Sequence, residues 1–403
     1  MTLRKLFQTR DLTLLWAGQV ISQSGDSIYL IGLLWLALEL SASKTVTGLV
    51  AMSAYLPAML FALAAGVAAD RYDRRRVMLA ADAVRAVAVL GIPLAALLGR
   101  LSPALLAADA FAIAIAATFF NPARDAVIPQ IVPREGLLRA NSLVQTSWQL
   151  AMLLGPAAAG VLLHRVGNIH LFTADAGAYV FSFLCILLLR PRSQPAPTEE
   201  RKPGLHEVLE GLRYVLRQPV ILPLLLITVA DNLFIMGPAI VGTPVFIKDV
   251  LSGRAQDYAL IQACYAVGML AGTAWLVTFG GRIRKGKLLL VGMFLDGITY
   301  VPYFFVRSLP LLAAATIVHA MAIPLLTVPR ASLIQGIVPQ RMTGRVFALV
   351  SLAVTGMSAV SSGITGVVLE WVPAPTLFLA IGLSGALCGV LGLALMKDLR
   401  RAG

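Results

Sequence analysis

Two long apolar runs are joined by the segment Gly66-Val67-Ala68-Ala69-Asp70-Arg71-Tyr72-Asp73-Arg74-Arg75-Arg76-Val77-Met78. This segment is too short to form a domain. It is also too basic to lie within a bilayer, where each charged side chain is costly. It therefore predicts a charged hairpin that connects two membrane-spanning helices outside the hydrocarbon.

The rest of the chain repeats this alternation of apolar runs and charged connections. Of the 403 residues, 13% are charged and 58% are hydrophobic, whereas a soluble domain carries about 25% charged residues. About twelve apolar runs reach the length of about 20 residues that a helix needs to cross a bilayer. Because backbone polar groups must be satisfied inside the bilayer, we predict an all-α membrane protein.

The formal net charge of +13 raises the question of a nucleic-acid partner. Most of the Lys and Arg residues lie in alternate connections, which are cytoplasmic if the N-terminus is inside. This positive-inside pattern predicts a multi-pass protein of the bacterial cytoplasmic (inner) membrane with both termini in the cytoplasm. The basic charge then indicates topology and contact with membrane lipids, with no nucleic acid as a partner.

A proline-rich polar segment interrupts the apolar runs near the middle of the chain, and its second part is amphipathic. The predicted domains are an N-terminal six-helix bundle (1–190), a cytoplasmic linker (191–218) and a C-terminal six-helix bundle (219–403). One constant offset places Arg124 on Arg330 and Arg139 on Arg345. We interpret this offset as a duplication of halves, an arrangement that supports alternating access.

The hairpin resembles the signature Gly-x-Leu-Ala-Asp-Arg-x-Gly-Arg-Arg/Lys, which lies between the second and third helices of major facilitator superfamily transporters. The matching positions are Gly66, Asp70, Arg71, Arg74 and Arg75, whereas Ala68 replaces the leucine and Asp73 the second glycine. The resemblance implies the major facilitator fold, with two six-helix bundles. It also implies that the matching residues form a conformational latch of the outward-facing state.

Other segments resemble one bacterial branch of this superfamily, which contains macrolide efflux proteins and the enterobactin exporter. The first apolar run carries Asp11-Leu12-Thr13-Leu14-Leu15-Trp16-Ala17-Gly18-Gln19. The segment Gly155-Pro156-Ala157-Ala158-Ala159-Gly160 is similar to the Gly-Pro-x-x-Gly-Gly motif of the antiporters, with Ala159 in place of one glycine. The resemblance implies export of an amphiphilic small molecule, and the partial motif favours antiport.

Asp26 is the first candidate for a proton-coupling group. Helical spacing places it on one polar face of the first span together with Gln19, Ser22, Gln23 and Tyr29. A charged carboxylate at the centre of a bilayer costs about 2.5–3.5 kcal/mol on insertion scales, so such a residue is a functional candidate. A low-dielectric cavity favours the protonated form, which would let Asp26 exchange protons. The alternative is a hydrogen bond that serves folding alone.

Further polar residues lie in other predicted spans. Asp231 is the second proton-coupling candidate, and Asn232 beside it is a cavity candidate. Both precede the Gly237-Pro238 pair, which can kink a helix, so a structural cap on the kink is the alternative. In the fifth span, an amphiphile-binding face is predicted from Asn141, Gln145, Trp148 and Gln149.

For some ionisable residues within the predicted spans, a structural role is the favoured interpretation. Asp82 and Arg85 are spaced for an ion pair on one side of a helix. Helix-packing hydrogen bonds are expected for the remaining group, Asp109, Asp175, Asp296 and His319.

One enzyme motif needs weighing, because His170 and Asp175 fit the His-x4-Asp pattern of membrane acyltransferases. Two residues make a weak pattern, and the sequence contains neither a Walker motif nor a metalloprotease or serine-hydrolase motif. We therefore expect no enzymatic activity, no cofactor and no metal site, with an acyltransferase as a remote alternative. The three cysteines lie in apolar runs, so we expect no structural disulfide.

The sequence thus predicts a secondary active transporter that works by alternating access. It would export a drug-like compound or a siderophore in exchange for protons and act as a monomer. An uptake permease and a lysophospholipid or lipid flippase on the same fold remain alternatives.

Overall fold

The computed structural model describes residues 10–41, 43–133, 136–190 and 204–403, without the side chains of Asp70, Leu138 and residues 204–208. Within these ranges the chain is almost entirely helical and contains no β-strand. Twelve of the described helical segments are long and apolar enough to cross a membrane. The predicted all-α membrane protein is therefore confirmed.

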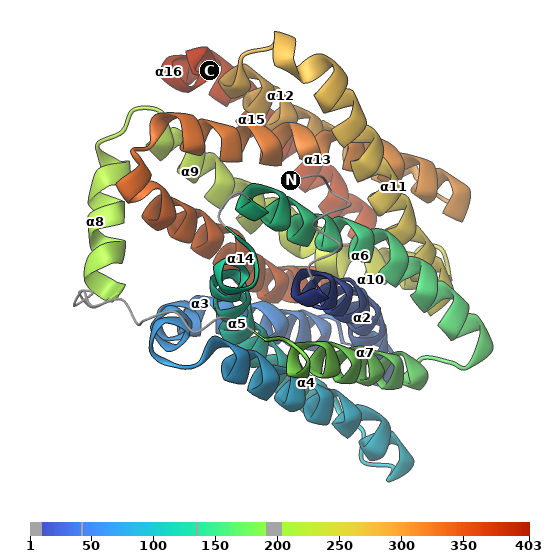
Figure 1. Ribbon diagram of the computed structural model, residues 1–403. Helices are drawn as coiled ribbons and strands as arrows, with labels where there is room; N and C mark the ends of the chain where they lie inside the picture. Colours follow the sequence, from blue (N-terminus) through green and yellow to red (C-terminus); the bar gives the residue numbers. More distant parts are fainter. Residues whose placement is uncertain (1–9, 42, 134–135, 191–203) are drawn as a thin grey trace. The chain divides into compact units, whose positions relative to one another are not determined.

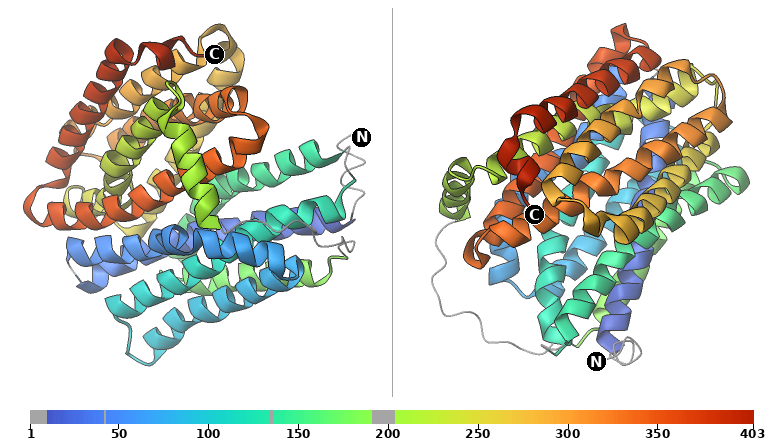
Figure 2. Two further views of the ribbon diagram at one scale, coloured as in Figure 1. Left: turned by 90° about the vertical axis from the view of Figure 1, so that its left-hand side faces the viewer. Right: turned by 90° about the horizontal axis from the view of Figure 1, so that it is seen from above.

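The chain divides into two compact units, one formed by Met1–Leu40 and Ser53–Gly204, the other by Ser41–Met52 and Leu205–Gly403. Helices of the N-terminal half are drawn in blue to green in Figure 1 and Figure 2: α2 (Arg10–Ser41), α3 (Lys44–Arg71), α4 (Arg74–Leu97), α5 (Pro103–Ile131), α6 (Leu137–Arg165) and α7 (Ile169–Leu187). The division passes through α3, whose first residues group with the second unit. The predicted domain boundaries stay a prediction, and residues 191–203 of the expected linker lie outside the described residues.

The second unit begins with the amphipathic helix α8 (Gly204–Leu216). The membrane-length segments after it are partly broken into shorter helices: α9 (Ile221–Asp231), η2 (Asn232–Met236), η3 (Pro238–Gly242), α10 (Thr243–Asp249), α11 (Ala255–Phe279), η4 (Gly280–Arg282), α12 (Lys285–Ile298), η5 (Val301–Phe305), α13 (Leu309–Ile337), α14 (Gln340–Trp371) and α15 (Ala374–Leu395). The last described helix is the short α16 (Lys397–Arg401). It lies beside α12 at one end of the unit (Figure 1).

Glycines spaced by seven residues bring α2 close to α7. A Cβ at Gly25 would meet the Cβ of Ala178 at 2.8 Å and a carboxylate oxygen of Asp175. Gly18 and Gly32 make similar approaches one heptad away on either side. Small residues of this kind let two helix backbones approach closely in a membrane. Polar groups of α2 are thereby placed directly against polar groups of α7.

The predicted kink at Gly237-Pro238 takes the form of π-helical turns, η2 and η3. Such turns widen a helix locally and often occur at functional sites. The Gly237 N–H donates a hydrogen bond of 2.8 Å to Ser361 Oγ on α14, so the widened backbone has a partner. A side chain at position 237 would collide with Ser361 and Thr365.

Many large apolar side chains remain exposed on both units. They include Val87, Leu97, Val277 and Trp371. Apolar patches of this extent are unusual on a soluble protein. They are the surface that a lipid bilayer covers.

Candidate functional site

The polar face of α2 contacts two neighbouring helices of its own unit. Gln19 Oε1 accepts a hydrogen bond of 3.1 Å from Arg124 Nη1 on α5 and one of 3.2 Å from Gln23 Nε2. Gln23 Oε1 in turn accepts a hydrogen bond of 3.0 Å from Ser147 Oγ on α6. Gln19 is buried and Gln23 half-buried, so this chain of amides is held inside the unit.

Asp26 lies one turn further along the same helix and meets α7. Its Oδ1 accepts a hydrogen bond of 2.5 Å from the Tyr179 hydroxyl. Tyr29 donates a hydrogen bond of 2.8 Å to Asp109 Oδ2 on α5. Two carboxylates of this unit are therefore paired with tyrosine hydroxyls, which are neutral donors and leave the carboxylate charge uncompensated.

Asp82 and Arg85 form an ion pair on α4, and both side chains are almost completely buried. The Arg85 guanidinium carbon lies 4.4 Å from the centroid of the Phe120 ring and 4.7 Å from that of Tyr179. Tyr179 thus contacts both Asp26 and Arg85. The ion pair and the Asp26 carboxylate belong to one cluster of α2, α4, α5 and α7.

Asp175 is the most isolated acid of this cluster. Its side chain is fully buried against Gly25, and neither of its carboxylate oxygens has a hydrogen-bond partner in the described part of the chain. Among the described residues of this unit, three carboxylates are buried, those of Asp82, Asp109 and Asp175, whereas Arg85 is the one buried cation. An unpaired buried charge is strongly unfavourable, so this excess of acids suits a cluster that binds a proton.

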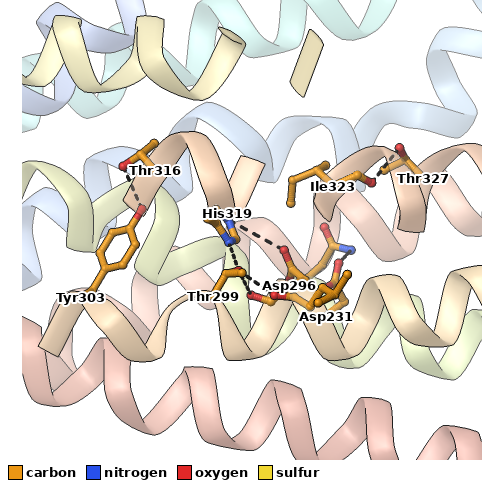
Figure 3. A network of polar contacts seen from close by, with 10 residues as sticks. Asp231, Asp296, Thr299, Tyr303, Thr316, His319, Ile323 and Thr327 are labelled. Carbon is orange, nitrogen blue, oxygen red and sulfur yellow. Dashed lines mark hydrogen bonds and ion pairs between the residues drawn. The ribbon is translucent and has the colours of Figure 1, made fainter. Parts of the chain in front are cut away.

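The second unit contains another polar cluster, drawn in Figure 3. Asn232 donates hydrogen bonds to the Thr228 carbonyl (2.8 Å) and to Asp231 Oδ2 (3.4 Å). Asp296 lies on α12, with its Oδ1 3.8 Å from Nε2 of His319 on α13. The figure shows Asp231 and Asp296 next to one another. Asp231 thus lies between Asn232 and a second buried carboxylate, Asp296, which faces His319.

The orientation of His319 is fixed by its other ring nitrogen. Nδ1 lies 3.0 Å from Thr299 Oγ1, and that hydroxyl already donates to the Leu295 carbonyl at 2.6 Å. The Nδ1–H is therefore the donor to Thr299, and Nε2 faces Asp296. The Tyr300 ring packs on the imidazole with centroids 4.0 Å apart.

Sequence reasoning expected a helix-packing hydrogen bond for His319 but did not identify its partners at the end of α12. A signal was present, because Asp296, Thr299, Tyr300 and Tyr303 recur at helical spacing and place one polar face toward α13. Tyr303 and Thr316 are joined by a hydrogen bond of 2.9 Å at the end of this face. Among the described residues, no group of three or more His, Cys, Asp or Glu side chains is arranged to hold a metal ion.

The predicted face of α6 is not covered by its own unit. Its four side chains, Asn141, Gln145, Trp148 and Gln149, are all exposed. In the antiporter-like segment, Gly155 packs against Ser27 and the Ser24 carbonyl of α2, Pro156 is buried and Gly160 half-buried. The segment thereby brings α6 against the helix that carries Asp26.

The hairpin residues of the predicted latch have different surroundings. Arg75 donates from Nε to the Ile186 carbonyl at 3.0 Å and from Nη2 to the Leu187 carbonyl, at the end of α7. Arg71 is exposed, Arg74 is half-buried and Gly66 has open space beside it. The side chain of Asp70 lies outside the described part of the structure.

The remote acyltransferase hypothesis is wrong. That chemistry requires Asp175 to orient His170 by a hydrogen bond. His170 is exposed, whereas Asp175 is fully buried and makes no hydrogen bond to a described residue. The pair therefore has no catalytic geometry.

Known proteins resemble the chain over almost its whole length. The family model described as "Transmembrane secretion effector" matches residues 6–400. The multidrug efflux pump Tap of Mycolicibacterium fortuitum is 27% identical over 400 residues, which cover 96% of either chain. Macrolide efflux protein A of Streptococcus pyogenes is 27% identical over 287 residues, covering 71% of this chain and 70% of that protein.

Solved structures with low sequence identity show the same fold. The nucleoside transporter NupG matches with a TM-score of 0.75 at 11% identity, covering 97% of this chain and 99% of that one. A POT family transporter matches with a TM-score of 0.76 at 13% identity, covering 97% and 96%. Together with the family match, this fold identifies the chain as a multi-pass membrane transporter and not an enzyme: it belongs to the transmembrane secretion effector family, within the major facilitator superfamily.

Proposed function

We propose that this transporter exports an amphiphilic small molecule by alternating access, in exchange for protons. The family and the efflux relatives support export. The exposed polar and aromatic face of α6 supplies groups suited to an amphiphile, namely three amides and the Trp148 ring. The chain would work as a monomer in the bacterial inner membrane.

One observation supports the proposed coupling of transport to protons. Among its described residues, the first unit holds more buried carboxylates than buried cations, and Asp26 lies at the less buried edge of that cluster. A carboxyl group that is only half-buried can take up and release a proton, whereas the fully buried Asp175 is shielded from solvent. We assign Asp26 as the coupling group of this unit and Asp231, paired with Asp296, as the second candidate.

The test uses the full-length protein in proteoliposomes with an imposed pH gradient and a fluorescent lipophilic cation as the substrate. Asp26→Asn keeps an oxygen acceptor for Tyr179 but cannot ionise. We expect uphill transport to fall to the level of protein-free liposomes, while downhill exchange of substrate persists. Persistence of downhill exchange shows that the variant is folded.

The matched control is Asp125→Asn. Asp125 is an exposed carboxylate on α5 that pairs with Arg124 at 2.8 Å, so its loss removes the same charge outside the cluster. We expect transport by this variant to remain unchanged. Uphill transport by Asp26→Asn at the wild-type rate would overturn the assignment, and wild-type transport that ignores the pH gradient would overturn proton exchange itself.

The predicted topology has an independent test. Tyr72 is exposed at the tip of the hairpin, so a Tyr72→Cys variant offers a reactive thiol there. A membrane-impermeant maleimide should label this cysteine in inside-out vesicles and leave it unlabelled in intact cells. The opposite result would place the hairpin on the outer side of the membrane.

A further inference from the structure

A cavity of about 640 Å³ opens at one end of the second unit. Five cationic residues line it, and its remaining walls are Ile283 and Leu393. The cations come from three places that are distant in sequence, the connection after α11, the first turn of α12 and the terminal helix α16: Arg282, Arg284, Lys287, Arg400 and Arg401. No carboxylate is among the described residues that line the cavity.

The helix α16 is packed against α12, so its arginines have a defined position in the cavity wall. Leu399 on α16 is fully buried, and the Gly286 N–H donates a hydrogen bond of 3.0 Å to the Ala402 carbonyl. Gly286 also lies directly against the Leu399 carbonyl, where a Cβ would collide. The Arg400 guanidinium donates to the Leu393 carbonyl at 2.6 Å. These contacts hold Arg400 and Arg401 beside the start of α12.

The charges of this cavity are not compensated within the described chain. None of the five cations forms an ion pair with a described carboxylate. The positive end of the α12 dipole points the same way, because Arg284 is the N-cap of α12 and no side chain caps that helix start. A cleft lined by several like charges attracts an anion.

The position of the cavity identifies the anion. It lies where two candidate spans end, at Arg282 and Leu395, and a third begins, at Lys285. This level is the boundary between hydrocarbon and water, where phospholipid phosphates lie. Arginine binds phosphate oxygens bidentately, and basic residues near a membrane surface attract anionic lipids. The apolar walls, Ile283 and Leu393, suit the first carbons of an acyl chain.

We propose that this cavity binds the phosphate of an anionic phospholipid headgroup and thereby anchors the terminal helix at the membrane surface. The proposal is independent of the transported substrate and of proton coupling. The lipid site would be formed by η4, the connection from η4 to α12, and the helices α12, α15 and α16.

The test is a binding titration on the purified full-length protein in a neutral detergent. The probes are a fluorescent phosphatidylglycerol, a fluorescent phosphatidylethanolamine and, as a competitor, inorganic phosphate. Wild-type protein should bind phosphatidylglycerol saturably and more tightly than phosphatidylethanolamine. The double variant Arg284→Gln/Arg401→Gln should weaken phosphatidylglycerol binding by about tenfold or more, since these two guanidinium groups line the cavity and would bind the phosphate directly.

A matched control removes the same charge beside the cavity. Lys285 lies on α12 and Lys397 on α16, and neither side chain lines the cavity. The double variant Lys285→Gln/Lys397→Gln should change the affinity by less than about threefold. A second variant, Gly286→Ala, keeps all five charges but pushes α16 away, and it should also lose the preference for phosphatidylglycerol.

Three results would overturn the proposal. One is equal affinity for the two lipids. Another is an equal loss of affinity in the two double variants, which would indicate general electrostatic attraction. The third is saturable binding of inorganic phosphate that displaces the lipid at comparable concentration, which would assign the cavity to a soluble anion.

Discussion

Replacement of Arg85 by methionine should destabilise the first unit far more than the loss of a surface arginine does. The Asp82 side chain is fully buried and that of Arg85 is 4% exposed, so water cannot solvate Asp82 once its partner is removed. Breaking a buried ion pair by removing one partner costs about 3–5 kcal/mol. The cation–π contacts with Phe120 and Tyr179 disappear as well, each contributing about 0.5–2 kcal/mol.

We therefore expect Arg85→Met to lower the free energy of unfolding by at least about 4 kcal/mol, roughly a thousandfold or more in the folding equilibrium. The double variant Asp82→Leu/Arg85→Met should recover most of this loss, because the Asp82 charge that lost its partner is removed as well. The assay is reversible unfolding by sodium dodecyl sulfate in mixed micelles, followed by circular dichroism. The single variants and the double variant form a thermodynamic cycle that gives the coupling energy.

Arg76→Met is the control for this cycle. The Arg76 side chain is exposed on the same helix, α4. Exposed charges contribute about 0–1 kcal/mol, so this variant should stay close to wild type. The reasoning fails if Arg85→Met costs no more than Arg76→Met. It also fails if the double variant loses as much stability as the two single variants together.

Two further predictions concern backbone contacts of other helices. Gly237→Ala should lower the free energy of unfolding by about 1–3 kcal/mol in the same assay, because its Cβ would collide with Ser361 of α14, which accepts the Gly237 N–H. Gly336→Ala is the control, because position 336 has open space around it, and this variant should not lower the stability. Equal effects of the two substitutions would contradict the packing argument. Arg75→Met should speed amide hydrogen exchange in the last turn of α7 by about tenfold, because two backbone carbonyls there lose their hydrogen-bond donor. The control is Arg76→Met, which removes an exposed neighbouring arginine. Unchanged exchange in Arg75→Met would show that the contact contributes little.

The sequence was sufficient to predict which segments are membrane helices and which face of α2 is polar. Both depend on local periodicity, since apolar length defines a span and a spacing of three or four residues defines a face. The structure accordingly finds Gln19 and Tyr29 buried on that face. The roles of these residues and of Asp26 in transport stay predictions, because periodicity says nothing about what a face binds.

The sequence was not sufficient to identify the partners of a polar face on other helices. Asp26 meets Tyr179, and Asp296 meets His319, because two helices are rotated so that one side chain of each points at the other. That rotation depends on the packing of all helices in a unit, which a single span does not encode. The π-helical form of the predicted kink has the same origin, since it depends on Ser361 being placed to accept the Gly237 N–H.

The hairpin shows why a residue that matches a motif can have more than one role. Asp73, which departs from the glycine of the major facilitator signature, is the N-cap of α4 and accepts a hydrogen bond of 2.8 Å from the Arg76 N–H, so the departure stabilises the helix start. Arg75, which matches the signature, binds the end of α7 inside its own unit. A transport defect in an Arg75 variant therefore identifies a conformational latch only if hydrogen exchange shows that the end of α7 is still closed.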